Sequence, residues 1–136
     1  MAGNVGAIIR LCASLGASLD IIEPCGFVWD KAKIGRAAMD YMDLCDITRH
    51  TDWKNFHENK TGRLILMTTK GATDLYDFEF QKGDILIAGR ESAGAPDYVH
   101  DAVDARIKIP MHGKARSLNI GHSCAIVLSE ALRQLK

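Results

Sequence analysis

The sequence lacks the cysteine spacing of a metal site and lacks any stretch built to cross a membrane. Its four cysteines stand alone, without a CxxC pair or paired cysteine and histidine ligands: Cys12, Cys25, Cys45 and Cys124. This spacing does not fit the common zinc folds, so we expect no metal. No signal peptide or apolar run of membrane-spanning length can be recognised. We therefore interpret the cysteines as buried, reduced thiols and expect a cytoplasmic protein without membrane association.

Net charge is absent as well, since 17 lysines and arginines balance 17 aspartates and glutamates. Taken alone, this neutrality argues against a nucleic-acid partner. The charge is nevertheless uneven, because from Arg106 to the end six basic residues accompany a single acidic one, Glu130. Such a basic region is equally compatible with an anion- or RNA-binding face and with a solvated surface.

The glycine motifs of nucleotide-binding loops are missing too. The segment GRESAGAP places Gly89 and Gly94 at the spacing of a phosphate-binding loop. However, Ala95 and Pro96 replace the lysine and the serine or threonine that such a loop needs. GxGxxG does not occur, so a dinucleotide-binding fold has no support. The two glycines are more simply interpreted as part of a tight turn.

What the sequence does contain is a regular alternation of apolar segments with helical and strand periodicity. We predict helices over residues 5–15, 31–41 and 117 to about 135, with shorter helices after Thr51 and at Pro96. We predict strands over residues 19–22, 45–48, 64–67, 85–88 and 107–109. This alternation indicates one α/β domain, residues 1–136, with three layers and a mainly parallel sheet.

Three of the predicted strands end in loops rich in glycine and small polar residues. These loops are TTKG after residue 67, GRESAG after residue 88 and PMHGKARS after residue 109. Ligands of open parallel sheets bind beyond the carboxyl ends of the strands. We therefore expect a binding site formed by all three loops.

Several polar residues are candidates for a site, and each has a simpler alternative. Glu91 could hold a ribose hydroxyl or a cation, although most exposed loop glutamates have no such role. Ser117 is a plausible N-cap of the last helix, whereas Asn119 is a poor helix former inside an apolar segment. Arg10 interrupts the apolar face of the first helix. Together with Asn4 it could face an anionic ligand, or it could simply be solvated.

Five segments, ordered along nearly the whole chain, carry a family resemblance: AGNVGAIIRLCASLG, IIEPCGFVWD, LMTTKG, ILIAGRESAGAP and IKIPMHGKARSLNIGHSCAIVLSEALRQL. They resemble the SPOUT class of RNA methyltransferases. Within it they are most similar to the TrmL (YibK-like) subgroup, which methylates the ribose 2′-hydroxyl of the tRNA wobble nucleotide. The resemblance implies a parallel α/β fold with a deep C-terminal trefoil knot, an exception to the rule that chains do not thread their own loops. It also implies S-adenosylmethionine (AdoMet) bound in the knot and tRNA as the partner.

The resemblance assigns roles to individual residues. The cofactor-binding candidates are Met67, Gly89, Ile109, Met111, Ser117 and Leu118. The catalytic candidates are Asn4, Arg10, Glu91 and Asn119. The sulfonium methyl of AdoMet is already activated, so the protein must mainly align the acceptor hydroxyl. Arg10 is the candidate to activate that hydroxyl, electrostatically rather than as a base, because a guanidinium does not readily lose its proton.

Family members are dimers whose last helices pack together. In this chain the last predicted helix has an apolar face broader than a one-sided contact needs: Ile120, Cys124, Val127, Leu128, Ala131 and Leu135. We therefore expect a homodimer through this helix.

Two features depart from the family pattern. The chain begins without the strand that the family has before GNVGAIIR, and Ser129 stands where subgroup members carry a tyrosine. Two alternatives therefore stay open. One is a related SPOUT enzyme that acts on ribosomal RNA, and the other is a cofactor- or RNA-binding module without catalysis.

Overall fold

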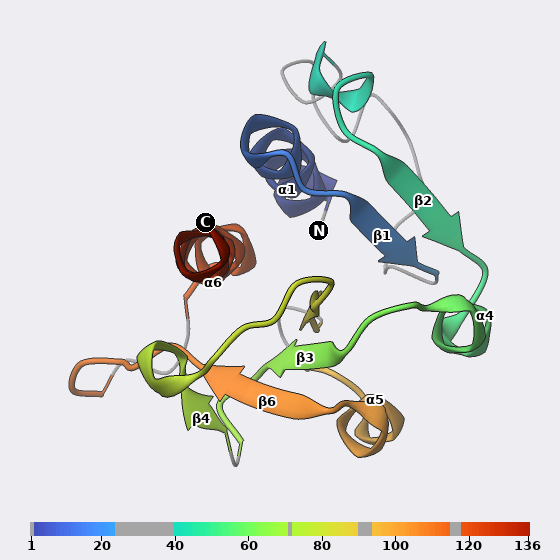
Figure 1. Cartoon of the computed structure of the whole chain (residues 1–136). Helices are drawn as coiled ribbons and strands as arrows, with labels where there is room; N and C mark the ends of the chain where they lie inside the picture. The colour runs from blue at the N-terminus through green and yellow to red at the C-terminus, as the bar shows by residue number, and fades with distance from the viewer. Residues whose placement is uncertain (1, 24–39, 71, 90–93, 115–117) are drawn as a thin grey trace. The chain divides into compact units, whose positions relative to one another are not determined.

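The computed structural model of the chain describes residues 2–23, 40–70, 72–89, 94–114 and 118–136. The chain divides into two compact units, Met1–Lys60 and Thr61–Lys136. Each unit contains a parallel sheet of its own (Figure 1). In the described ranges no helix has the length and apolar character that a membrane crossing requires.

The first unit pairs two short parallel strands and carries two helices. Its elements are α1 (Ala2–Leu15), β1 (Leu19–Ile22), β2 (Ile47–His50) and α4 (Trp53–Asn59). α1 ends at Gly16, whose φ of 76° is the left-handed conformation that glycine adopts after a helix. The core of the unit is centred on Ile9, Cys12 and Cys45. Cys12 and Cys45 are buried free thiols, as predicted, and burial raises the pKa of the Cys45 thiol.

The second unit contains a four-stranded parallel sheet with the order β4-β6-β3-β5. Its elements are β3 (Leu64–Met67), β4 (Thr73–Asp74), the one-turn helix η1 (Leu75–Asp77), β5 (Ile85–Ala88), α5 (Asp97–Ala102), β6 (Ala105–Lys108) and α6 (Ile120–Leu135). β3 is the uniformly apolar run LILM, and its first three residues are fully buried. A strand of this composition is expected in the interior of a sheet, and β3 lies there between β6 and β5.

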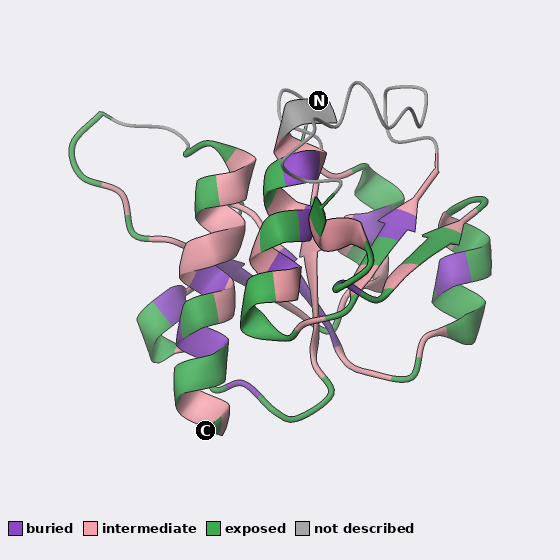
Figure 2. Ribbon diagram, turned by 90° about the horizontal axis from the view of Figure 1, so that it is seen from above, coloured by how far each residue is buried: buried purple, intermediate pink, exposed green. Residues whose placement is uncertain are grey.

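α6 packs against this sheet. Its residues Val127 and Ala131 belong to the same buried cluster as Ile65 of β3 and Ile107 of β6. In Figure 2, α6 is the helix that ends at the label C, and it shows bands of buried, intermediate and exposed residues. This is the pattern of an amphipathic helix with one face on a core.

Most of the predicted elements are confirmed. The helix over residues 5–15 and the strands over 19–22, 64–67 and 85–88 lie where the sequence predicts them. The parallel pairing confirms the predicted α/β class. The helix predicted over 31–41 lies mainly outside the described residues, although residues 40–42 are helical. The single domain, its three layers and the knot stay predictions.

Two predicted helix caps are wrong. α4 begins after Asp52 rather than Thr51, because the Asp52 carboxylate accepts a hydrogen bond from the amide of Asn55 at 2.8 Å. α6 begins at Ile120 rather than near residue 117, because Asn119 caps it.

Two predicted strands are displaced along the chain. The prediction over 45–48 corresponds to β2 at residues 47–50, and the prediction over 107–109 corresponds to β6 at residues 105–108. Pairing decides these limits, since Leu19 of β1 lies opposite Ile47, and Ile65 of β3 lies opposite Ala105. β4 and η1 have no counterpart among the predicted elements.

Candidate active site

The carboxyl ends of β3, β5 and β6 lie next to one another in the sheet. Met67, the last residue of β3, pairs with Ala88 of β5 and with Ile107 of β6. The amide of Thr68 then donates to the carbonyl of Ile107 at 2.9 Å, so the contact between β3 and β6 continues into the loop. The three loops predicted to form a site therefore leave the sheet at the same edge.

Apolar side chains remain accessible at this edge. Met67 and Ile109 are half-buried and pack against the core of the second unit. Met111 is half-buried as well, and Leu118, just before α6, is 39% exposed. A partly exposed apolar surface at strand ends suits the adenine and aliphatic parts of an organic ligand. Among the described residues, no group of His, Cys, Asp and Glu is arranged to hold a metal ion.

Close packing of the protein backbone explains why residue 89 is a glycine. A Cβ atom at this position would lie 2.5 Å from the Ala95 nitrogen and 2.6 Å from the Gly94 carbonyl carbon. Both are backbone atoms, so any side chain would push residues 94 and 95 away from β5. The close approach of a ligand is therefore not needed to explain this glycine, and a larger residue here would disturb the loop itself.

Asn119 is a structural residue of α6, whatever else it does. Its side-chain oxygen accepts hydrogen bonds from the amides of Gly121 at 2.8 Å and His122 at 3.4 Å. The sequence suggests that Asn119 lies inside the last helix. The structure instead places it at the N-cap, directly before the first residue of α6. Two further candidates, Glu91 and Ser117, lie outside the described residues.

Arg10 and Asn4 lie on α1, in the first unit. They are six positions apart, which places them about 120° from each other around the helix axis. Arg10 is exposed, and its guanidinium carbon lies 5.1 Å from the centroid of the Tyr41 ring. Asn4 is half-buried. The two residues therefore do not form one compact group on α1.

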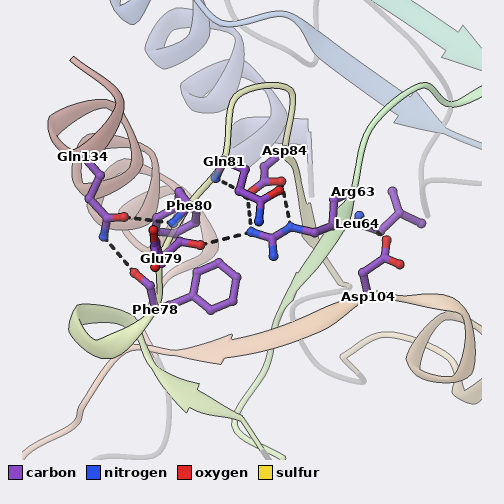
Figure 3. Close-up of polar contacts among 9 residues, drawn as sticks. All are labelled: Arg63, Leu64, Phe78, Glu79, Phe80, Gln81, Asp84, Asp104 and Gln134. Atoms are coloured by element: carbon purple, nitrogen blue, oxygen red, sulfur yellow. Dashed lines mark hydrogen bonds and ion pairs between the residues drawn. The ribbon is translucent and has the colours of Figure 1, made fainter.

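At the opposite end of the second sheet, Arg63 makes several polar contacts (Figure 3). Arg63, just before β3, donates to both carboxylate oxygens of Asp84 at 2.9 and 2.8 Å and to the carbonyl of Glu79 at 3.1 Å. Its guanidinium also lies over the Phe78 ring. Burial opposes ionisation of Asp84, but the hydrogen bonds from Arg63 and the Gln81 amide outweigh it and lower the pKa of Asp84.

A second polar group fastens α6 to the segment before β5. The Gln134 side chain accepts from the amide of Phe80 and donates to the carbonyl of Phe78, both at 2.9 Å (Figure 3). Glu130 accepts from Gln134 and forms a two-point ion pair with Arg133. The hydrogen bonds from Arg133 and Gln134 lower the pKa of Glu130 to about 2. Glu130 is therefore ionised near neutral pH, and both of its carboxylate oxygens are engaged in structural contacts.

Cys124 is a poor candidate for a catalytic nucleophile. Burial raises the pKa of its thiol to about 11, so the nucleophilic thiolate is scarce at neutral pH.

Two sets of side-chain contacts, one in each unit, are missed by sequence reasoning. The contact of Tyr41 with Arg10 has only one signal in the sequence, the place of Tyr41 on the apolar face of the helix predicted over residues 31–41. The role of Gln134 has no signal, because a polar residue near a helix end is ordinarily solvated.

Comparison with known proteins identifies the family. The family model described as the SpoU rRNA Methylase family matches residues 1–129. A curated protein of Ancylobacter novellus, named tRNA (cytidine(34)-2′-O)-methyltransferase, is 47% identical over 98% of this chain and 87% of its own length. The protein of the same name from Escherichia coli K12 is 43% identical over 97% of this chain and 86% of its own length.

Solved structures agree with this assignment. A structure from work on the 2-OH methylation of C/U34 on tRNA matches with a TM-score of 0.92 at 35% identity, covering 99% of this chain and 90% of that one. The AdoMet-bound SpoU methyltransferase AviRb from Streptomyces viridochromogenes matches with a TM-score of 0.88 at 26% identity, covering 99% of this chain and 56% of that one. The α/β fold with parallel sheets is therefore the fold of these enzymes, and the chain belongs to the SpoU rRNA Methylase family.

Proposed function

We propose that this chain transfers the methyl group of AdoMet to the ribose 2′-hydroxyl of nucleotide 34, the wobble nucleotide, of tRNA. The observation that most supports this is the 47% identity, over 98% of the chain, to a protein named tRNA (cytidine(34)-2′-O)-methyltransferase. The match to a structure concerned with C/U34 points the same way. Ribosomal RNA is the second candidate substrate, because the description of the family itself names it.

AdoMet is proposed to bind at the carboxyl edge of the second sheet. The half-buried side chains of Met67, Ile109 and Met111 offer apolar contacts for its adenosine part, and the loops beyond them offer backbone polar groups. We assign Gly89, Ser117 and Leu118 to the same site. When bound there, AdoMet supplies an electrophilic methyl group that needs no further activation by the protein.

The protein's part in the chemistry is then alignment and charge. The protein would have to hold the acceptor oxygen next to the methyl group of the bound cofactor. The 2′-hydroxyl would pass its proton to water, and negative charge develops on the oxygen as it does so. We propose that Arg10 stabilises that charge. Asn4, Glu91 and Asn119 are proposed to orient the nucleotide, and Asn119 would do so in addition to capping α6.

We also propose a homodimer through α6, with the family's trefoil knot and a cytoplasmic location. Val127 and Ala131 of α6 are buried in the core of the second unit, yet Leu132 is 41% exposed. Apolar residues beyond the face that meets the sheet give α6 a surface for a second copy. Leu132→Asp should give monomers, whereas Leu44→Asp, at a residue 71% exposed in the first unit, should not. A wild-type protein that sediments as an active monomer at micromolar concentration contradicts the dimer.

The function is tested with purified protein, labelled AdoMet and two RNA pools, total tRNA and ribosomal RNA. Labelled methyl groups should enter tRNA, and nuclease digestion with mass spectrometry should place them on the 2′-oxygen of nucleotide 34. Methylation of ribosomal RNA alone would favour the second substrate. AdoMet binding by calorimetry without transfer to either pool would instead indicate a binding module.

A further inference from the structure

Within the described part of the chain, the partner of the Arg10 guanidinium is an aromatic ring and not a carboxylate. Its guanidinium carbon lies 5.1 Å from the centroid of the Tyr41 ring, within the range of a cation–π contact. α1 contains no acidic residue. The positions that a helical side chain can reach, one turn before and after Arg10, are all small and uncharged: Gly6, Ala7, Ala13 and Ser14. Among the residues that the structure describes, no carboxylate forms an ion pair with Arg10.

Tyr41 is itself held in place by the first unit. It is half-buried and packs against the buried cluster of Ile9, Cys12 and Cys45. Its carbonyl accepts a hydrogen bond from the amide of Leu44 at 3.0 Å, which closes the turn after it. Since Ile9 precedes Arg10 directly, the ring that faces the guanidinium rests on the same helix that carries it.

We propose that Tyr41 is a positioning residue for Arg10. The ring face holds the planar guanidinium in one orientation while leaving its charge unneutralised. A carboxylate in the same place would also hold Arg10, but it would cancel the charge that is meant for the developing oxyanion. The inference rests on the role of Arg10 in the proposed function, and Tyr41 is not proposed to touch the substrate or AdoMet.

The test compares variants that keep an aromatic ring at position 41 with variants that keep only an apolar side chain there. Tyr41→Phe and Tyr41→Trp retain a π face, whereas Tyr41→Leu and the more adaptable Tyr41→Met do not. In single-turnover methyl transfer to tRNA at saturating AdoMet, the first pair should stay within about twofold of wild type, and the second pair should slow by about three- to tenfold. The affinity for AdoMet should be unchanged in all four. Tyr98→Leu, at a tyrosine 57% exposed in the second unit, is the matched control and should keep the wild-type rate.

A double-variant cycle separates positioning from mere packing. On an Arg10→Ala background, Tyr41→Leu should cost nothing further, because no guanidinium is left to hold. Equal slowing by Tyr41→Leu with and without Arg10, or equal rates for Tyr41→Phe and Tyr41→Leu, overturns the inference. If Arg10→Ala slows the reaction and Tyr41→Leu does not, only the role of Tyr41 fails. If Arg10→Ala itself has the wild-type rate, the catalytic role of Arg10 fails, and the role of Tyr41 fails with it.

Discussion

Among the described residues, an arginine lies over an aromatic ring in each unit, and the surroundings of these two arginines differ. Arg63, before β3, faces the Phe78 ring at 5.2 Å and donates to both oxygens of Asp84 and to a backbone carbonyl. Arg10, on α1, faces the Tyr41 ring at 5.1 Å and has no carboxylate partner among the described residues. The ring contact is the same in both, and the difference is the counter-charge.

This difference separates a structural arginine from one whose charge is available to a ligand. The charge of Arg63 is balanced by an aspartate whose side chain is only 5% exposed, so that pair joins the segment before β3 to the segment before β5. The charge of Arg10 has no such partner in the described ranges, and the Arg10 side chain is exposed. Removing each arginine should therefore affect different properties of the protein.

The largest effect is expected for Arg10→Ala. Losing charge stabilisation at the acceptor oxygen should cost about 3 kcal/mol of transition-state stabilisation, or roughly a hundredfold in single-turnover rate. The melting temperature and AdoMet affinity should barely change, because Arg10 is exposed and is not proposed to touch the cofactor. Arg10→Lys should recover little, since an ammonium cannot copy the planar fork. A rate within twofold of wild type would remove Arg10 from the mechanism.

Arg63→Ala should show the opposite pattern, with a loss of stability and little change in the rate of the folded protein. It leaves the Asp84 carboxylate enclosed without its main partner, which should lower the free energy of unfolding by about 2–4 kcal/mol. Denaturant titration at neutral pH measures this loss. An Arg63→Ala variant with wild-type stability and a slow reaction would contradict the purely structural role of Arg63.

The Arg63–Asp84 ion pair also predicts how the stability of the protein changes at acidic pH. The pKa of Asp84 is lowered in the folded state, so its stabilisation is present above the ordinary carboxyl pKa of about 3.9 and is lost as the pH falls through the folded value. In Arg63→Ala burial dominates and should raise the pKa of Asp84, so this variant should lose less stability than wild type between neutral pH and about pH 4.

The smallest effect is expected at Asn119. Asn119→Ala removes the cap of α6 and should cost about 1 kcal/mol of stability, whereas Asn119→Asp keeps a capping oxygen and should cost less. If Asn119 also orients the nucleotide, both variants should slow methyl transfer. If capping is its whole role, the rate of Asn119→Asp should equal that of wild type.

The sequence predicts the strands that carry the loops of the candidate site, because buried strands leave recognisable apolar runs in the sequence. The apolar runs at 64–67 and 85–88 can be read as strands without knowledge of their neighbours, and their ends mark the loops of the site. The rules of parallel sheets place these ends on the same side of the sheet. The pairing of Met67 with Ala88 and Ile107 adds that the three strands are neighbours.

The rest depends on contacts between segments that are distant in the sequence. Gly89 must be glycine because the backbone of residues 94 and 95 packs closely against it. The order of residue types in the sequence does not reveal this contact. Asn119 is read as a misplaced polar residue until the start of α6 is known. The contacts of Arg63 with Asp84 and of Arg10 with Tyr41 join side chains through the fold. Periodicity reports which face of an element is buried, but not which side chain on another element it meets.

The central claim is that this chain methylates the wobble ribose and that Arg10 supplies the charge for the reaction. It is tested most directly in an Escherichia coli K12 strain that lacks its own tRNA (cytidine(34)-2′-O)-methyltransferase and expresses either this chain or its Arg10→Ala variant. Mass spectrometry of purified tRNA then measures the 2′-O-methyl group at nucleotide 34. The wild-type chain should restore that methyl group, and the variant, at the same protein level, should leave most of the tRNA unmodified. Soluble wild-type protein that leaves nucleotide 34 unmethylated, or a variant that restores the group as fast as wild type, would contradict the account.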